Sequence, residues 1–360
     1  MSVTAGSWNA SATSWPLYVD KVLLATPRSF CAGVEMAIKA LARLVDLFDP
    51  PVYCYHEIVH NRVVVERFEQ VGVIFVDTLD EVPPGAPLML SAHGSPPELV
   101  AAARARGGVV VNAVCPLVAK VHHEVKVRAG RGFTVLYAGH EGHDEAIGTM
   151  AVAPSAMRLV EHEADVDRLD DVEGPTAFLA QTTLSVDEWK GVLAAAQQRF
   201  PDLWVPERSD LCFATTNRQA ALKAIAGRSD AIVVIGSANS SNALALVKVA
   251  ESSGCARVLR VDGPAELPAD LAGTVGVTAG ASTAEQIVRA VVARLAPAEG
   301  VEVVSVTDEA EYFPPPRELR ELLRSRKAEH LLDDDASVGA SEVLGILSSG
   351  PRSCASRTTR

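Results

Sequence analysis

Three cysteines in the sequence have the surroundings of metal ligands. Cys31, Cys115 and Cys212 each stand directly before a helical pattern, in SFCAGVEMAIKAL, NAVCPLVAKVHHEV and DLCFATTNRQAALKAI. A helix N-terminus stabilises a thiolate through its free N–H groups and its dipole. The cysteines are nearly a domain's length apart, which is too wide for a zinc knuckle or a CxxC pair but suits one ligand from each of three folded units. Three thiolates leave a fourth position open, so the pattern favours one [4Fe–4S] cluster with an open apical iron over structural zinc.

The other three cysteines lack this context. A free cysteine is often a small, inert residue of the hydrophobic core. We therefore expect Cys54, Cys255 and Cys354 to take no part in metal binding.

Histidines occupy several of the expected loops. His60 lies in YHEIVHNR, His93 in SAHGSPP and His143 in AGHEGHDEAIGT, and the last two segments follow expected strands. The carboxyl ends of strands in open α/β sheets commonly line ligand sites. Few lysines or arginines stand near these histidines. The histidines themselves therefore predict a pocket for an anion. Glu145, two residues after His143, is positioned to supply a proton.

For the remaining polar residues around these motifs we expect structural or solvent-facing positions. His56, His122 and His123 are expected in core or capping roles. Asp144 is a rival acid to Glu145, but we expect it to face solvent.

Three strands run into loops that are rich in small polar residues. These loops are QTTLS with Thr182, GSANSSN with Ser240, Ser241 and Asn242, and TAGAST with Ser282. Each is expected to open a helix, and N–H and hydroxyl donors at a helix start can bind phosphate. Alone each loop is weak evidence, since the same residues cap helices that bind nothing. Together, beside three histidines, they predict a phosphate-containing ligand.

Bulk composition excludes several classes of protein. At 360 residues and 48% hydrophobic, the chain can bury a large core, and its formal net charge of −12 argues against nucleic acid as a partner. No apolar run is long enough for a membrane span. Met1 to Asp20 has neither the basic start nor the apolar core of a secretory signal. A chain of this size needs no disulfides, so we expect a reducing cytoplasm.

The chain alternates short β-branched runs with helical patterns. Such alternation is typical of α/β units with parallel sheets. We expect strands at Lys21–Ala25, Val52–Tyr55, Val73–Val76, Leu88–Ser91, Val109–Asn112, Thr134–Ala138, Ala177–Ala180, Ala231–Ile235, Arg257–Val261 and Thr274–Thr278.

Taken together, the motifs resemble the 4-hydroxy-3-methylbut-2-enyl diphosphate reductase (LytB-type) family. They run from about residue 21 to residue 315 in that family's order: PRSFCAGVEMAI, HEIVHNR, SAHG, CPLVAKVH, GHDEAIGTM, QTTLSVDEW, DLCFATTNRQ, GSANSSN and GVTAGAS. The resemblance implies a trefoil of three similar α/β units around a central [4Fe–4S] cluster. It also implies reductive removal of the allylic hydroxyl of (E)-4-hydroxy-3-methylbut-2-enyl diphosphate. The products are isopentenyl and dimethylallyl diphosphates, at the last step of the methylerythritol phosphate route to isoprenoids.

The resemblance also implies roles for individual residues. Cys31, Cys115 and Cys212 match the three cluster ligands, and His60, His93 and His143 match histidines that line the substrate cavity, the first two near the diphosphate. Glu145 matches the acid that delivers the proton, and Thr182 matches a hydroxyl beside the substrate's alcohol. Ser240, Asn242 and Ser282 match residues that bind the diphosphate, with Ser241 close by. Catalysis is thus expected from Glu145, Thr182 and His143.

On this basis the chain divides into five parts. They are a disordered extension over 1–20, a first unit over 21–115 whose N-terminal strand could instead join the third, a second unit over 116–208, a third unit over 209–315, and a C-terminal helix and disordered tail over 316–360.

Some positions depart from the family's pattern. Val114 and Ala119 replace threonines near the second cysteine, Ala238 replaces a commonly charged residue, and Asp144 replaces a proline. A lost hydroxyl near a cluster removes a hydrogen bond that would tune its potential. None of the matched catalytic positions is lost, but a divergent paralogue that acts on a related allylic diphosphate remains an alternative.

Two other classes stay open, a non-redox iron–sulfur hydratase or dehydratase and a non-catalytic iron–sulfur sensor. The sensor would not need Glu145 or the phosphate loops, so their presence counts against it. The chain has neither a GxGxxG fingerprint nor a P-loop. Electrons must therefore come from a separate donor, such as ferredoxin or flavodoxin, with no nucleic acid or membrane as partner.

Overall fold

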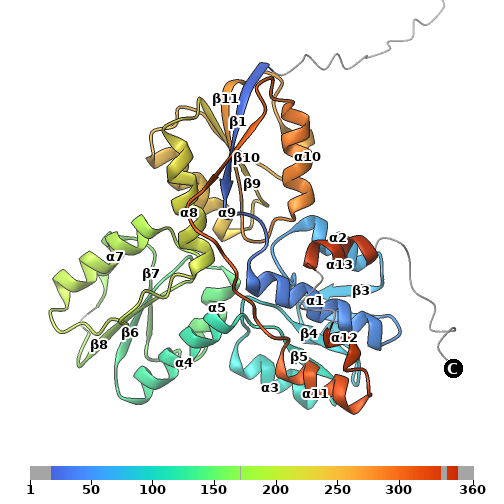
Figure 1. The fold of residues 1–360 in the computed structure, drawn as a ribbon. Coiled ribbons are helices and arrows are strands. Elements are labelled where there is room, and N and C mark those ends of the chain that lie inside the picture. The colour runs from blue at the N-terminus through green and yellow to red at the C-terminus, as the bar shows by residue number, and fades with distance from the viewer. Residues whose placement is uncertain (1–17, 171, 334–338, 348–360) are drawn as a thin grey trace, which may run out of the picture.

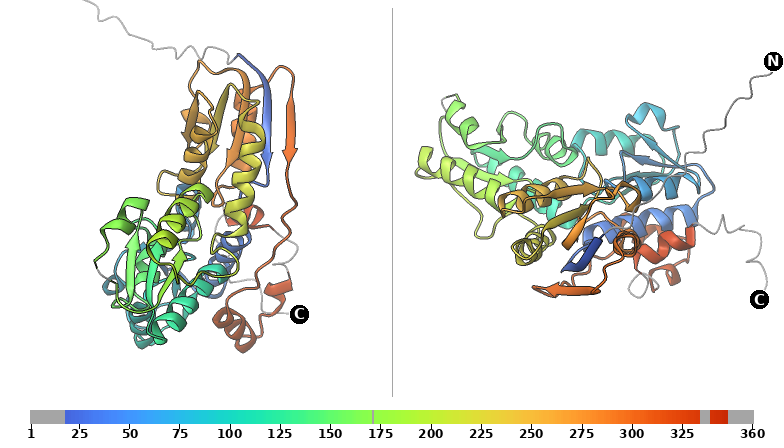
Figure 2. Two further views of the ribbon diagram at one scale, coloured as in Figure 1. Left: turned by 90° about the vertical axis from the view of Figure 1, so that its left-hand side faces the viewer. Right: turned by 90° about the horizontal axis from the view of Figure 1, so that it is seen from above.

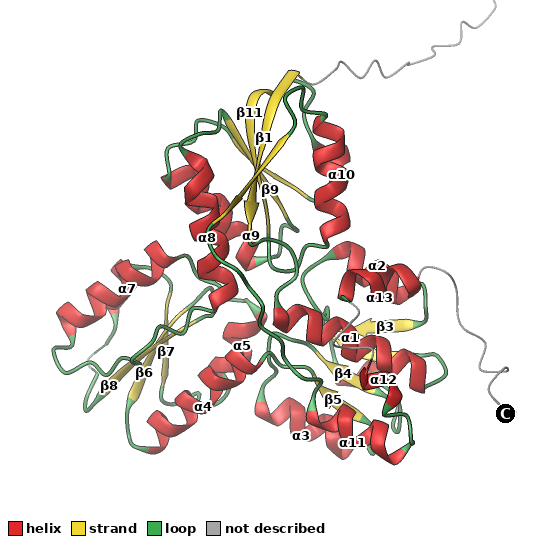
Figure 3. Ribbon diagram, viewed as in Figure 1, coloured by secondary structure: helices red, strands yellow, loops and turns green. Residues whose placement is uncertain are grey.

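The computed structural model describes residues 18–170, 172–333 and 339–347, and these form three lobes around a common centre (Figure 1). Each lobe has its own parallel β-sheet, with five, four and three strands, and helices beside it (Figure 3). The expected α/β fold, with three units in a trefoil, is therefore confirmed.

The five-stranded sheet has the order β10-β9-β11-β1-β12. Its strands are β1 (Tyr18–Thr26), β9 (Ala231–Ile235), β10 (Val258–Val261), β11 (Ala272–Ala279) and β12 (Val301–Ser305). Helices α8 (Phe213–Ala226), α9 (Ser241–Ser252) and α10 (Glu285–Leu295), and the 3-10 helix η2 (Pro264–Glu266), belong to this lobe. Strand β1 pairs in parallel with β11 and β12, so the first strand of the chain lies in the sheet of the third unit.

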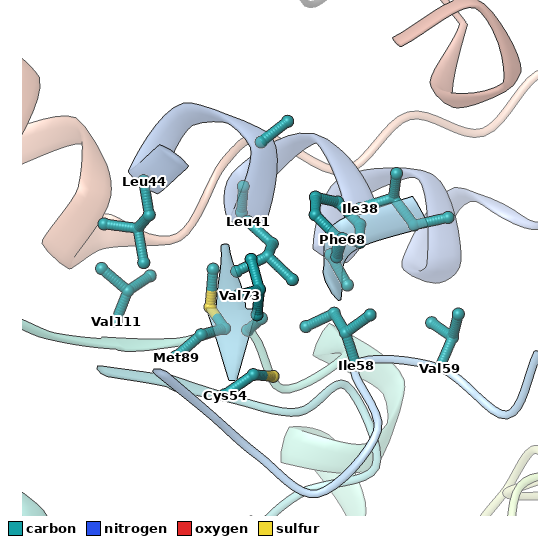
Figure 4. Packing of buried hydrophobic residues seen from close by; sticks show 14 of the residues in the cluster. Ile38, Leu41, Leu44, Cys54, Ile58, Val59, Phe68, Val73, Met89 and Val111 are labelled. Carbon is teal, nitrogen blue, oxygen red and sulfur yellow. The ribbon is translucent and has the colours of Figure 1, made fainter. Parts of the chain in front are cut away.

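The four-stranded sheet has the order β3-β2-β4-β5. Its strands are β2 (Val52–Tyr55), β3 (Val73–Val76), β4 (Leu88–Leu90) and β5 (Val110–Asn112), and its lobe contains α1 (Ala32–Leu47), α2 (Arg62–Glu69), α3 (Pro97–Ala105) and the 3-10 helix η1 (Leu79–Glu81). Ile38 and Leu41 of α1 pack onto Met89 in one buried cluster (Figure 4). That cluster fixes the direction in which α1 points from Cys31.

The three-stranded sheet has the order β7-β6-β8. Its strands are β6 (Thr134–Ala138), β7 (Met157–Val160) and β8 (Thr176–Ala180), with helices α4 (Pro116–Gly130), α5 (Asp144–Met150), α6 (Glu163–Arg168) and α7 (Val186–Arg199). Buried hydrophobic clusters lie on both faces of this sheet.

After β12 the chain returns to the first lobe. Residues 306–316, here called the strap, run from the third lobe past the centre to α11 (Arg317–Ser325) (Figure 1), and the left view of Figure 2 shows this segment descending from β12 along one side of the molecule. Leu319 and Leu323 of α11 are fully buried in the core of the first lobe.

The C-terminal region is more ordered than the sequence led us to expect. Two further helices, α12 (His330–Asp333) and α13 (Ala340–Leu347), lie within the expected disordered tail. Ala340, Val343 and Leu344 of α13 are buried in the same core as α1 and α2. The expectation of disorder is thus wrong for α13, because these apolar residues pack on the first lobe. Residues 348–360, with Cys354, lie outside the described residues.

The first described strand begins earlier in the sequence than expected. Tyr18 to Asp20 belong to β1, while residues 1–17 lie outside the part of the chain that the structure describes. Among the described helices, none combines the length and hydropathy that crossing a membrane requires.

Candidate active site

The three cysteines singled out in the sequence meet in one pocket at the centre of the trefoil. Cys31, Cys115 and Cys212 are the N-cap residues of α1, α4 and α8, which come from the three different lobes. All three are free thiols, and all three line the same pocket. The Sγ of Cys212 accepts a hydrogen bond of 3.2 Å from the backbone N–H of Thr215, the helix-start contact that stabilises a thiolate.

The space beside the sulfurs is kept free by Gly33. A Cβ added there would lie 2.8 Å from Sγ of Cys115 and 3.9 Å from Sγ of Cys31. Gly33 does not adopt a positive φ, so the close approach of the sulfurs, and not the backbone, is what requires a glycine here.

Electrostatics also makes these thiols suitable ligands for a cationic group. Burial, with the charge of Cys31 as a second cause, raises the pKa of Cys115 and of Cys212 to about 12. The pKa of Cys31 is raised by burial as well, with the charge of Arg218 opposing it. Three thiolates so close together need cationic compensation, which a bound iron group would supply. The donor set therefore fits an iron–sulfur cluster.

The three expected histidines form a cluster beside the cysteines. The rings of His60 and His93 are stacked with centroids 4.0 Å apart, and His143 meets them edge-on at 5.6 Å and 6.1 Å. His143 is the N-cap of α5, and its Nδ1 accepts a hydrogen bond from the N–H of Glu145. Burial lowers the pKa of His143 to about 4 and that of His93 well below its usual value, with the charge of His60 adding to both effects.

Glu145 is the buried acid of the pocket. It is 2% exposed, and its two carboxylate oxygens accept hydrogen bonds from the backbone N–H of Thr182 at 2.7 Å and from the Thr182 hydroxyl at 2.9 Å. Burial raises the pKa of Glu145 to about 7, although the Thr182 hydrogen bonds oppose the shift. A carboxyl group that is partly protonated at neutral pH can act as a general acid.

The polar loops close the pocket from the side of the third lobe. The Ser282 hydroxyl donates to the backbone carbonyl of His60 at 3.0 Å and lies 3.4 Å from the hydroxyl of Ser240. Asn242 Oδ1 accepts from the N–H of Ala281 at 2.9 Å. These contacts bring the second and third phosphate-type loops together and join them to the histidine loop of the first lobe.

The first phosphate-type loop is joined to the second in the same way. Ser241 contacts Gln181 Nε2 at 3.0 Å and the Thr183 hydroxyl at 2.9 Å. The second and third lobes therefore meet at the pocket through hydroxyl and amide groups.

The position of one residue beside the histidine cluster was misjudged from the sequence. Asp144 does not face solvent; its side chain is 18% exposed, and Oδ1 lies 2.9 Å from Nδ1 of His56. Its other oxygen, Oδ2, is 3.8 Å from Nε2 of His60 and from Nδ1 of His93. His56, which has a positive φ of 56°, uncommon for a non-glycine residue, pairs with this carboxylate and is not among the described residues that line the pocket, so its role here is structural.

The Asp144 carboxylate is ionised in this setting. Burial opposes its ionisation, but the hydrogen bond with His56 and the charges of His93, His56 and His60 lower its pKa to about 2. The only signal in the sequence was the adjacency of Asp144 to His143 and Glu145, whereas the partner His56 comes from another lobe.

The resulting pocket has a cavity of about 100 Å³. Its described lining holds every site residue expected from the sequence, and neither a lysine nor an arginine is among them. The strap contributes Phe313 to the wall, a residue that no sequence motif indicated. Cys54 lies in the hydrophobic core of the first lobe, and Cys255 lies near Ser229 and Arg257, so neither lines the pocket.

Comparison with known proteins gives a consistent result. The family model described as LytB protein matches residues 22–296. A 4-hydroxy-3-methylbut-2-enyl diphosphate reductase of Rhodopirellula baltica is 48% identical over 306 residues, covering 83% of this chain and 96% of that protein. A protein of Mycobacterium tuberculosis, 4-hydroxy-3-methylbut-2-enyl diphosphate reductase 1, is 46% identical over 309 residues, covering 83% and 94%.

Two solved structures share the fold. The E-1-hydroxy-2-methyl-but-2-enyl-4-diphosphate reductase of Plasmodium falciparum superposes with a TM-score of 0.82 at 31% identity, covering 87% of this chain and 100% of that one. An (E)-4-hydroxy-3-methyl-but-2-enyl diphosphate reductase, described as the terminal enzyme of the non-mevalonate pathway, has a TM-score of 0.57 at 28% identity, covering 77% and 99%.

Proposed function

This chain belongs to the LytB protein family, and we propose that it reductively dehydroxylates (E)-4-hydroxy-3-methylbut-2-enyl diphosphate to isopentenyl and dimethylallyl diphosphates. The observation that carries this proposal is one pocket shared by three lobes, in which three thiols, a buried acid and hydroxyl-rich loops face one another. The reaction consumes two electrons and two protons and releases the allylic oxygen as water.

We propose that Cys31, Cys115 and Cys212 hold one [4Fe–4S] cluster with a fourth iron left open. Their positions at three helix starts and the free space beside Gly33 support this ligand set. When bound, the cluster would supply electrons one at a time and a Lewis-acidic iron for the substrate's oxygen.

The protein's own side chains would deliver the proton to the leaving oxygen. Glu145 is the proposed donor, because burial holds its pKa near neutrality and because hydroxide is a poor leaving group without protonation. Thr182 orients both oxygens of this carboxyl group through its N–H and its hydroxyl. His143, which caps the helix that carries Glu145, fixes the start of that helix against the cavity.

The diphosphate would bind where the histidines and the polar loops line the cavity. His60, His93, Ser240, Asn242 and Ser282 supply ring N–H, hydroxyl and amide donors there, with Ser241 next to them. Because the described lining of the pocket holds neither lysine nor arginine, hydrogen bonds must carry most of this binding, and the diphosphate would position the allylic carbon for reaction.

The electrons require an external donor, for which a ferredoxin or flavodoxin remains our proposal.

The five described cysteines are free thiols, which is in keeping with the reducing cytoplasm proposed as the working compartment.

The test is anaerobic purification, iron and sulfide analysis, and a turnover assay with and without reductant. We expect four irons and four sulfides per chain and turnover only with reductant. Replacing Cys31, Cys115 or Cys212 with Ser should abolish the chromophore, whereas Cys255→Ser, the matched control outside the pocket, should keep it. Bound zinc without sulfide would overturn the ligand assignment. Turnover without reductant would identify a hydratase or dehydratase instead.

A further inference from the structure

One buried charge beside the cysteines has no role in the chemistry proposed above. Arg218 lies on α8, the helix that Cys212 caps, and it is 1% exposed. It does not line the pocket, so it cannot contact the substrate. Burying a guanidinium is costly unless its donors are paired, so a fully buried arginine implies a specific arrangement around it.

Arg218 joins α8 to the segment that leads into Cys31. Its Nη2 donates to the carbonyl oxygen of Ser29 at 2.6 Å and to that of Arg28 at 3.3 Å, and its Nη1 donates to Ala214 O of its own helix at 2.9 Å. Arg218 thereby bridges the starts of α1 and α8, which two of the three cysteines cap.

The segment before Cys31 needs such support. Ser29 has a positive φ of 62°, a strained conformation for a non-glycine residue. Glu285 of α10 holds the same segment from the other side, accepting from the Ser29 hydroxyl and from Nη2 of Arg28 at 2.7 Å each. The position of Cys31 is therefore set by a network in which Arg218 is the innermost member.

Arg218 is also partly neutralised from the strap. Both oxygens of Glu309 accept from its Nη1, at 3.0 and 3.1 Å, and Asn217 donates to the same carboxylate at 3.2 Å. The side chain of Glu309 is 11% exposed. The ion pair therefore places one positive and one negative charge between the strap and the starts of α1 and α8, the helices that Cys31 and Cys212 cap.

We propose that Arg218 is a positioning residue for the cysteine centre, which fixes Cys31 relative to Cys212 and, together with Glu309, sets the reduction potential of the cluster held there. The inference rests on the cluster proposed above. A buried cation favours the more negative, reduced cluster and so raises the potential, while a neighbouring anion lowers it.

The test is the midpoint potential of the anaerobic holoenzyme, measured by optical or EPR titration in variants that change one charge each. Arg218→Gln should lower the potential, by about 59 mV if the ratio of reduced to oxidised cluster at fixed potential falls tenfold. Glu309→Gln should raise it, because the guanidinium is then uncompensated. Arg228→Gln is the matched control, since Arg228 is an exposed arginine just beyond α8 that pairs with Glu302.

A purely structural ion pair gives a different pattern. It would make both variants lose cluster faster and leave the potential of the remaining cluster unchanged, and that result would overturn the proposal. Shifts in the same direction for both variants would also overturn it. If the Arg218→Gln variant fails to assemble a cluster, the midpoint potential of the Glu309→Gln variant decides the question. In that variant Arg218 keeps its hydrogen bonds to the carbonyl groups of Arg28 and Ser29. Wild-type protein without iron and sulfide would refute the cluster itself, whereas a cluster that does not respond to these charges would refute only the role of Arg218.

Discussion

At the scale of single residues, the site depends on which carboxyl group is protonated near neutral pH. Glu145 and Asp144 are neighbours in sequence, yet their environments separate them. Burial raises the pKa of Glu145 to about 7, whereas the histidines around Asp144 lower its pKa to about 2. Only the first can be both protonated and reactive near neutral pH.

We therefore expect turnover to fall as the pH rises through about 7, because Glu145 must be protonated to act and loses its proton above its pKa. Glu145→Gln should lower kcat by about 10²–10⁴-fold, the usual contribution of general acid catalysis. The measurement is the pH profile of kcat. Asp144→Asn is the control, and its profile should keep the same alkaline fall. An unchanged kcat in Glu145→Gln would show that another group donates the proton.

A second residue-scale prediction concerns the anion side of the pocket. His93→Ala should weaken substrate binding by about 1.5–3 kcal/mol, the usual value of a hydrogen bond to a charged group. Titration calorimetry with the substrate and with the free alcohol would measure it. The exposed His123→Ala serves as the control. Equal loss of affinity for diphosphate and alcohol would show that His93 does not contact the phosphates.

At the scale of elements, the three cysteines meet because each caps a helix whose start faces the shared pocket. The approach is so close that Gly33, in the first turn of α1, has no room for a side chain beside Cys115. Helix placement and the proposed cluster binding are thus coupled.

Gly33→Ala should therefore reduce cluster content severely while the apo-protein stays folded, because the added methyl would lie 2.8 Å from the Cys115 sulfur. Iron and sulfide analysis together with circular dichroism would measure both effects. Gly130→Ala is the matched control, since Gly130 also lies in a helix and a Cβ there would meet nothing within 4 Å. Normal cluster content in Gly33→Ala would contradict the proposed ligand geometry.

Helix α13 allows an element-scale prediction about stability. Leu344 is 7% exposed and packs in the core of the first lobe. Leu344→Ala should cost about 2 kcal/mol, at the low end for a buried leucine because a terminal helix can detach. Urea unfolding and hydrogen exchange of α13 would measure the loss, with the exposed Glu342→Ala as the reference. Unchanged exchange in Leu344→Ala would mean that the helix contributes no docking energy.

At the scale of the whole molecule, the lobes are joined by polar contacts at the pocket. The His56–Asp144 pair links the first lobe to the second, Ser241 links the third to the second, and Ser282 links the third to the first. The hydrogen bond with Asp144 raises the pKa of His56, against the smaller effect of burial.

The stability that this pair contributes should depend on pH in a defined window. Asp144 has a lowered pKa, so its contribution is present above its unfolded pKa near 4 and is lost in stronger acid. His56 has a raised pKa, so its contribution is full below its unfolded value near 6.5 and is lost as the pH rises through its folded value. The difference in Tm between wild type and Asp144→Asn should therefore be largest between about pH 4 and 6.5. A difference independent of pH would show that the pair is not ionic.

Much of this protein could be predicted from its sequence, for local reasons. A cysteine before a helical pattern, a strand that runs into a polar loop and the alternation of strands and helices are all set by neighbouring residues. They therefore predicted Cys31, Cys115 and Cys212 as helix caps, Glu145 beside His143, and the α/β fold. The family resemblance added the trefoil and the expected grouping of these residues, and their shared pocket agrees with it.

The tertiary structure decided what depends on partners far away in the chain. Asp144 is paired with His56 from another lobe, Arg218 finds its acceptors in the segment before Cys31, and α13 packs on the apolar surface of the first lobe. No local pattern encodes these contacts, since each joins segments from different lobes or distant parts of the chain. Sequence alone thus determined which groups could do the chemistry, whereas the packing of three lobes determined their distances, their burial and their charge.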